Sequence, residues 1–238
     1  MASEPYGKPV PLIPPAGSTE DIALFPLGTV LVPGMRLALH VFEPRYRQLV
    51  ADLLSETDPG APVFGVVALR RGWEVGELGD VFEVGTTARV TDMKPLPDGR
   101  CDLAAVGERR FRIEELDTAT SPYLRATVRY LDEDDGDIDP GAVERVGNAL
   151  ARHIAMLSAL HTETSASITV ADARSLSYAV AEHPLLPLAD RQELVECRDT
   201  ASRLSAGRKI LRRESLLLTQ LRAIPATAAM LRLAAPPS

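Results

Sequence analysis

The sequence contains few of the residues used for covalent or metal chemistry. Only two of its 238 residues are cysteines, Cys101 and Cys197, and they lie far apart with no CxxC pair. This usage excludes a disulfide framework and the common zinc motifs, and it is typical of a reduced cytoplasmic protein. No run reaches the ~18 apolar residues that a spanning helix requires. Residues 1–20 lack the basic start and apolar core of a secretion signal, so we expect a cytoplasmic protein with no membrane partner.

Lysine is also scarce. Lys8, Lys94 and Lys209 are the only lysines, so arginine carries almost all of the positive charge. The formal net charge is −7. Because a duplex-binding protein usually needs a dense basic face, this balance disfavours a broad nucleic-acid surface.

Strand signals dominate the chain from Ile22 to Leu131. Two apolar runs flank a predicted turn at Pro33-Gly34, and a helix is expected over Glu43–Ser55. Alternation of apolar and polar residues predicts a strand around Phe82–Val90. Consecutive strands of this kind indicate a curled antiparallel sheet or a small barrel.

Two further turns are predicted within this β-rich part. The segment 95–99, PLPDG, is a turn because proline fixes φ, Asp98 can bond the backbone and Gly99 tolerates positive φ. Gly107-Glu108 is predicted to be a tight turn between a strand over Cys101–Val106 and one over Arg109–Leu116.

The acidic segment 132–139 marks a change of period from strands to helices. Asp139 is expected to cap the first of these helices, with Pro140 as its first residue. Another helix should end before Pro184, because the residue before a proline avoids helical angles. The expected helices are 140–160, 172–182, 188–196 and 199–222.

The predicted fold class is α+β, with a β-rich part followed by a helical bundle. We expect a tail over residues 1–20, a β-rich subdomain over 21–132, a helical subdomain over 133–222 and a second tail over 223–238. The tails are rich in small residues and proline, and are expected to be disordered.

Three segments together resemble the amino-terminal substrate-binding domain of Lon proteases. They are IALFPLGTVLVPGMRLALHVFEPRYR, DVFEVGTTARVTDMKPLPDGRCDLAAVGERRFRI and HPLLPLADRQELVECRDTASRLSAGRKIL. The likeness extends from Ile22 to Leu221, with the segments in order. It implies a PUA-like β-barrel followed by a helical bundle, which agrees with the periodicity described above.

The catalytic modules of full Lon proteases are not expected here. No GxxxxGK[ST] phosphate loop is present, since Gly7-Lys8 lacks the upstream glycine and lies in a proline-rich tail. No lysine is placed to activate a serine. We therefore expect a stand-alone, non-enzymatic substrate-binding domain with no cofactor and no catalytic residues.

No metal site is expected either. In the acidic segment, a calcium loop with Gly136 at its sixth position would need carboxylates at Leu131 and Ala142, so a solvated linker is preferred. His153 and His161 share a predicted helix but lie eight residues apart, too far for an i, i+4 ligand pair. Cys101 is expected to be a packed thiol.

A basic cluster lies on the last predicted helix. It could meet phosphate or an acidic partner, but a solvated helix face is the preferred interpretation. Asp199 stands four residues before Arg203, a spacing that suits a helix ion pair. The cluster consists of Arg203, Arg208, Lys209, Arg212 and Arg213.

Five residues are candidates for binding a peptide. Trp73 stands in a glycine-flanked loop, where it could anchor a peptide or equally cover one end of the barrel. Met35 suits a surface that accepts varied side chains. Core packing is the favoured alternative for Leu31 and Val32. The candidates are Trp73, Met35, Val32, Leu31 and Pro33.

The favoured function is binding of unfolded or exposed apolar polypeptide segments, with a separate protease or chaperone as a further partner. The alternative is an RNA-binding PUA-like module, against which the acidic balance counts. A hydrolase is disfavoured because the sequence offers no nucleophile and base that would meet.

Overall fold

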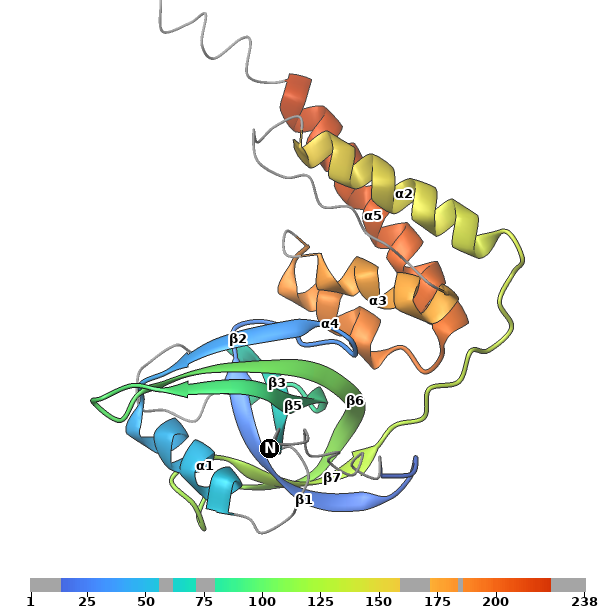
Figure 1. Ribbon diagram of the computed structural model, residues 1–238. Coiled ribbons are helices and arrows are strands. Elements are labelled where there is room, and N and C mark those ends of the chain that lie inside the picture. Colours follow the sequence, from blue (N-terminus) through green and yellow to red (C-terminus); the bar gives the residue numbers. More distant parts are fainter. Residues whose placement is uncertain (1–13, 56–61, 72–79, 159–171, 184–185, 224–238) are drawn as a thin grey trace, which may run out of the picture. The chain divides into compact units, whose positions relative to one another are not determined.

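The chain divides into two compact units, residues 1–133 and 134–238, which are described separately below. The structure is a computed structural model that describes residues 14–55, 62–71, 80–158, 172–183 and 186–223 (Figure 1). Strands build the first unit and helices the second, so the α+β prediction is confirmed. Within the described residues, no helix combines the length and the apolar character needed to cross a bilayer.

The first unit, here called the β-unit, is a curled seven-stranded sheet. Its strands follow the order β1-β7-β6-β5-β3-β4, and β3 also pairs in parallel with β1, so that the curl closes on itself. The other pairings are antiparallel, and β2 pairs with the first part of β6. The elements are β1 (Thr19–Leu27), β2 (Arg36–Val41), α1 (Pro44–Ser55), β3 (Val63–Arg71), β4 (Asp80–Val81), β5 (Val84–Pro95), β6 (Cys101–Asp117) and β7 (Arg125–Tyr130).

Helix α1 lies on one part of the curled sheet and seals its core there (Figure 1). The ring of Tyr46 stacks on Phe25 of β1 with centroids 4.1 Å apart, and Phe25 in turn meets Phe64 of β3 at 6.1 Å. The Tyr123 hydroxyl donates to the Asp52 carboxylate of α1 at 2.8 Å. Burial of these aromatic rings is the main stabilising contribution at this end of the unit.

Strand β6 corrects one prediction. The expected turn at Gly107-Glu108 is absent, and a single strand runs from Cys101 to Asp117. Gly107 exchanges backbone hydrogen bonds with the 33–35 turn: its N–H donates to the Met35 carbonyl at 2.9 Å, and its carbonyl accepts from Gly34 N–H at 2.8 Å. A Cβ at position 107 would clash with the Val32 carbonyl oxygen. The glycine serves close backbone approach, which sequence spacing does not distinguish from a turn.

The other two predicted turns are confirmed. Gly34 has φ 85° and Gly99 has φ 79°, values that favour glycine. In the hairpin between β5 and β6, Gly99 N–H donates to the Leu96 carbonyl at 3.1 Å, and the Asp98 carboxylate accepts from Arg100 N–H at 3.2 Å. The PLPDG segment therefore turns by the mechanism that its residues predict.

The second unit, here called the helical unit, is a bundle of four helices in its described part. They are α2 (Ala142–Ser158), α3 (Ala173–Glu182), α4 (Leu188–Glu196) and α5 (Thr200–Ala223). These bounds agree closely with the prediction except at the start of α2, which begins two residues later than expected. The Asp139 carboxylate accepts from Gly141 N–H at 2.9 Å, so a turn precedes the helix there.

Arginines from successive helices cap the helix before them. Arg191 of α4 donates from Nε to the Ala181 carbonyl in the last turn of α3 at 2.8 Å. Arg203 of α5 donates from Nε to the Leu194 carbonyl in the last turn of α4 at 3.1 Å. The last carbonyls of a helix have no partner within the helix, so these guanidinium groups satisfy acceptors that burial would otherwise leave unbonded.

Arg203 is the most deeply placed charge of the helical unit. Its side chain is 0% exposed, its guanidinium carbon lies 4.0 Å from the centre of the Tyr178 ring, and Nη1 donates to Ser177 Oγ at 3.1 Å. It therefore joins α5 to both α3 and α4. The Asp199 carboxylate caps α5 by accepting from Ser202 N–H at 2.7 Å, and it pairs with Arg198 at 2.8 Å. The ion pair expected between Asp199 and Arg203 stays a prediction.

The acidic segment makes more contacts than a solvated linker would. The Asp134 and Asp135 carbonyls accept from the N–H groups of Thr200 and Ala201, both at 3.0 Å, at the first turn of α5. The Asp135 carboxylate accepts from Arg174 Nη2 at 2.7 Å. The segment thereby satisfies donors at the start of α5 that a helix cannot satisfy itself.

We predict that Gly107→Ala destabilises the β-unit by about 2 kcal/mol or more, because the added methyl group forces the 33–35 turn away from β6. Hydrogen-exchange mass spectrometry should show faster exchange in β2 and β6. Gly147→Ala on α2 is the control, since its Cβ would meet nothing closer than 4.0 Å, and it should be neutral or stabilising by about 0.5–1 kcal/mol. Equal protection of β6 in wild type and Gly107→Ala would contradict the prediction.

We predict that Arg203→Ala costs the helical unit about 3 kcal/mol, because it leaves buried acceptors unbonded and opens a cavity. Amides of α3, α4 and α5 should lose exchange protection more than those of the β-unit. Arg198→Ala is the control, since that side chain is 89% exposed, and its effect should stay within about 0.5 kcal/mol. Similar losses in both variants would mean that burial of the guanidinium is not what secures the helices.

Candidate functional site

Four of the five residues predicted to bind a peptide lie in the described part of the chain. Leu31 and Val32 are 2% and 1% exposed, as the core-packing alternative expects, so they offer almost no surface to a ligand. Pro33 and Met35 are half-buried. Trp73 lies outside the described residues. A role for Pro33, Met35 and Trp73 in peptide binding stays a prediction.

A half-buried apolar strip extends from Met35 across β2 and β5. Its members, which pack against the core cluster under α1, are Met35, Leu39, Val90 and Met93, and they are called the methionine strip below. Leu39 of β2 and Met93 of β5 both pair with Leu103 of β6, one from each side. Residues paired in this way point to the same face of a sheet, so Leu39 and Met93 flank the buried Leu103 on that face.

The methionine strip has a composition suited to varied contacts. Two of its four members are methionines, whose unbranched and polarizable side chains adapt to irregular partners. The sequence alone identifies Met35 as a member of this strip. Leu39, Val90 and Met93 can be assigned to it only when the register of β2, β6 and β5 is known.

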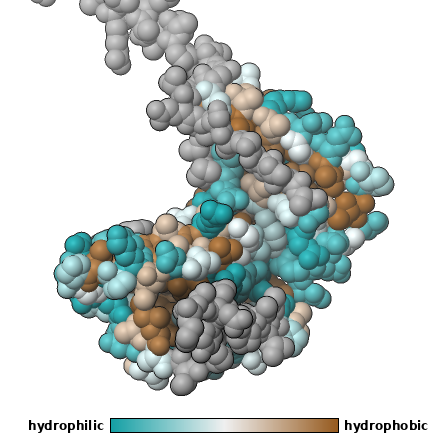
Figure 2. Space-filling model, in the orientation of Figure 1, coloured by the Kyte–Doolittle hydropathy of each residue, from teal (hydrophilic) through white to brown (hydrophobic). Residues whose placement is uncertain are grey.

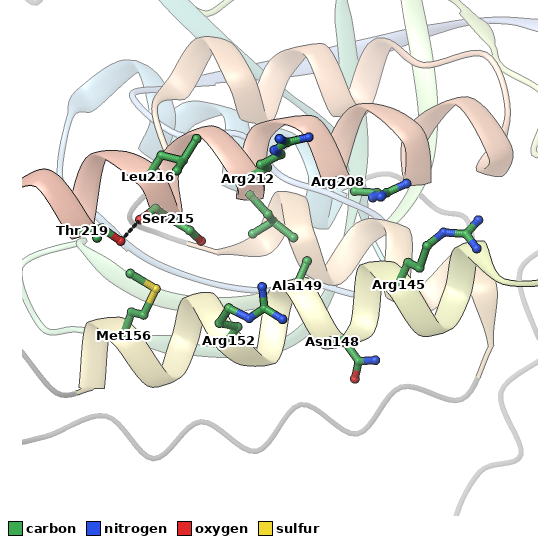
Figure 3. A pocket seen from close by; sticks show the side chains of 11 residues that line it. Arg145, Asn148, Ala149, Arg152, Met156, Arg208, Arg212, Ser215, Leu216 and Thr219 are labelled. Atoms are coloured by element: carbon green, nitrogen blue, oxygen red, sulfur yellow. Dashed lines mark hydrogen bonds between the residues drawn. The ribbon is translucent and has the colours of Figure 1, made fainter.

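A groove lies between α2 and α5 in the helical unit. It has a volume of about 580 Å³, within the range of ligand-binding clefts. Figure 3 shows the side chains of α2 and α5 that line it. The lining residues used below are Arg145, Arg152 and Met156 of α2 and Arg208, Leu211, Arg212 and Leu216 of α5.

The groove combines an apolar floor with basic walls. Leu211 is fully buried between the helices, and Leu216 is 57% exposed. Figure 2 shows the same contrast on the helical unit, where a hydrophobic band is bordered by hydrophilic surface. Arginine can cover apolar surface with its stem while its guanidinium stays in water, so this lining leaves both kinds of contact open to a ligand.

The positive charge in the groove is incompletely neutralised within the described part of the chain. Arg145 pairs with Asp139 just before α2. For Arg152, Arg208 and Arg212, by contrast, no ion pair with another described residue is present. The groove therefore carries an excess of positive charge although the chain as a whole is acidic.

The basic cluster predicted on α5 occupies four different environments. Arg203 is buried in the bundle, and Arg213 pairs with Asp190 and with Glu214, the latter at 2.9 Å. Arg208 and Arg212 line the groove, while Lys209 is exposed outside it. The preferred interpretation as one solvated face is wrong for Arg203, which is buried, whereas the other four residues are exposed as that interpretation expects.

The remaining candidates are the cysteine at position 101 and the histidines. Cys101 is 7% exposed in the core, and burial raises the pKa of its thiol, as a packed cysteine requires. Among the described residues, no group of three His, Cys, Asp or Glu side chains converges as a metal site would require. His161 lies outside the described residues.

Two histidines form a pair inside the helical unit. His153 of α2 is 2% exposed, and its ring meets the ring of His183, after α3, edge to face at 5.3 Å. Burial lowers the pKa of both imidazoles, and a positive charge on His153 lowers the pKa of His183 further. The negative charge of Glu214 opposes the effect of burial on His153 but is the smaller of the two effects. The positive charge of Arg191 also lowers the pKa of His183.

Comparison with known proteins identifies the family. Residues 21–213 match the family described as the ATP-dependent protease La (LON) substrate-binding domain. The chain belongs to this family. The Lon-like resemblance of the sequence is thereby confirmed over nearly the range from which it was inferred.

Relatives among curated proteins are full Lon proteases. This Lon-type domain is 28% identical over 204 residues to Lon protease 1 of Herpetosiphon aurantiacus, covering 82% of this chain and 24% of that protein. It is 27% identical over 180 residues to the Lon protease of Amoebophilus asiaticus, covering 73% of this chain and 21% of that protein. The chain thus spans about a quarter of the length of these proteases.

Solved structures share the fold. The Lon N-terminal domain protein from Xanthomonas campestris has a TM-score of 0.58 and 24% identity, with 78% of this chain and 95% of that chain covered. The N-terminal domain of the Mycobacterium avium complex Lon protease has a TM-score of 0.55 and 14% identity, with 81% and 98% covered. At such identities the likeness shows the fold alone.

We predict that the helical unit of this Lon-type domain loses stability as the pH falls below about 6.5, the ordinary pKa of histidine. The folded-state pKa of His153 and His183 is lowered, so below that pH the unfolded chain binds more protons and unfolding is favoured. Thermal unfolding between pH 7.5 and 5.0 measures the effect. His183→Phe should flatten the profile, because it removes one of the two imidazoles whose pKa burial lowers. An unchanged slope in His183→Phe would contradict the assignment.

Proposed function

We propose that this Lon-type domain is a non-catalytic binding module that recognises unfolded or exposed apolar polypeptide segments. The observation that carries the proposal is the family match over residues 21–213 together with the half-buried methionine strip on the β-unit. Pro33 and Trp73 are proposed to extend the contact surface. The bound segment would pass to a separate protease or chaperone, as in cytoplasmic protein quality control.

The strip supports binding that is weak and permissive. Burial of a few hundred Å² of apolar surface yields several kcal/mol at about 25 cal/mol per Å², and ordering an unfolded segment consumes much of this gain. A flexible methionine surface also discriminates little between apolar side chains. Low affinity and broad selectivity suit a module that samples many unfolded clients.

The direct test compares one client in two states. A carboxymethylated, permanently unfolded protein and its native form are titrated against the domain by fluorescence anisotropy. The unfolded form should bind at least tenfold more tightly, and incubation with the domain, with or without ATP, should leave it intact. Equal affinities would overturn the recognition of unfolded segments, and cleavage products would overturn the non-catalytic assignment.

We predict that Met93→Ser weakens binding of the unfolded client about fivefold, equivalent to ~1 kcal/mol of lost apolar contact. Met93→Leu should retain most of the affinity, because it conserves apolar volume. The matched control is Leu116→Ser, which removes an apolar side chain that is 41% exposed on β6 outside the strip. If Leu116→Ser and Met93→Ser weaken binding to the same extent, the strip is not the binding surface.

A further inference from the structure

We propose that the groove between α2 and α5 is a second binding site, selective for a polypeptide segment that carries both carboxylates and apolar side chains. The proposal is independent of the methionine strip, because it concerns the other unit and another chemistry. It commits to an acidic amphipathic segment as the occupant, and it rests on the shape, the charge and the floor of the groove.

The dimensions of the groove suit a short segment of chain. Arg145 to Met156 on α2 and Arg208 to Thr219 on α5 each cover about 16 Å at the helical rise of about 1.5 Å per residue. Three turns of a ligand helix have that length. An amphipathic helix laid between two helices is a recurring mode of peptide recognition.

Charge complementarity specifies the acidic part of the ligand. Four arginines line the groove, two from each helix, and the described residues supply an ion-pair partner only for Arg145. Guanidinium groups match carboxylates in geometry and bind them through two parallel hydrogen bonds. Because the chain has a net charge of −7, the groove is a local exception that attracts an acidic segment without attracting long polyanions.

The floor specifies the apolar part of the ligand. Leu211, Leu216, Met156 and Ala149 contribute carbon surface to the same groove. A phosphate ion or a nucleic-acid backbone has no group that gains from contact with these side chains. An amphipathic polypeptide has both kinds of group, so it alone uses the whole lining.

The two chemistries are ordered along the groove. Figure 3 shows Arg145 and Arg208 at one end, Arg152 and Arg212 in the middle, and Met156 with Leu216 and Thr219 at the other end. Arg208 and Arg212 are four residues apart on α5, a spacing of about 6 Å along the axis. A ligand helix with carboxylates four residues apart and an apolar side chain one turn further along would match this order.

The test uses a fluorescein-labelled, alanine-rich peptide of about sixteen residues, long enough to form a helix. It carries two glutamates four residues apart, followed three residues later by a leucine. Two companion peptides replace both glutamates by glutamine, or the leucine by serine. We expect the glutamine peptide to bind the full chain at least tenfold more weakly and the serine peptide about fivefold more weakly. Binding should weaken severalfold between 50 and 300 mM NaCl.

Charge-reversal variants locate the site. Arg212→Glu should weaken binding of the acidic peptide at least tenfold, because it removes an attractive charge and adds a repulsive one. Lys209→Glu is the matched control, since it makes the same change in net charge one turn away, outside the groove, and should alter binding less than twofold. Both side chains are exposed, so circular dichroism should report the same helix content in both variants.

Three results would overturn the proposal. Equal losses of affinity in Arg212→Glu and Lys209→Glu would show that the peptide does not bind in the groove. Equal affinities of the glutamate and glutamine peptides would show that carboxylates are not required. Displacement of the peptide by inorganic phosphate or single-stranded RNA at lower concentration would assign the groove to phosphate instead. A titration of the unfolded client against Arg212→Glu distinguishes the two proposals. The variant should bind the client with the affinity of the wild-type chain, whether or not the groove binds the acidic peptide.

Discussion

Burial of the Arg203 guanidinium is the constraint on which the helical unit depends. A charge removed from water must find acceptors, and this one finds them in the last turn of α4, at Ser177 of α3 and over the Tyr178 ring. These contacts set the rotation of α5 about its axis. The same rotation turns Arg208 and Arg212 toward α2, so the groove follows from the position of a residue that does not line it.

The acidic segment is explained by the same principle in both units. Arg110 of β6, 1% exposed, donates to the Glu133 carboxylate at 2.6 Å and to the Asp132 carbonyl at 2.9 Å. Asp135, a little further along the chain, accepts from Arg174 and Thr200 in the helical unit. Each end of the segment thus bonds to its own unit. The carboxylates of Glu133 and Asp135 are thus structural partners of arginines.

Membership of the Lon substrate-binding family gives the two surfaces a common context. The methionine strip offers adaptable apolar contact, whereas the groove offers carboxylate recognition beside an apolar floor. The two proposed sites differ in chemistry, so each would take a different class of polypeptide segment.

Local chemistry made much of the fold predictable from the sequence. Proline, aspartate and glycine in residues 95–99 specify their turn by their own dihedral preferences, and Asp172 specifies the start of α3 by accepting a backbone hydrogen bond from Ser175. Other features depend on neighbours distant in sequence. Gly107 is a point of close approach only because the 33–35 turn lies against it. Likewise, one basic run on α5 divides into buried, paired and groove-lining arginines. Contacts with the other helices decide the environment of each side chain, and spacing along a single helix cannot reveal those contacts.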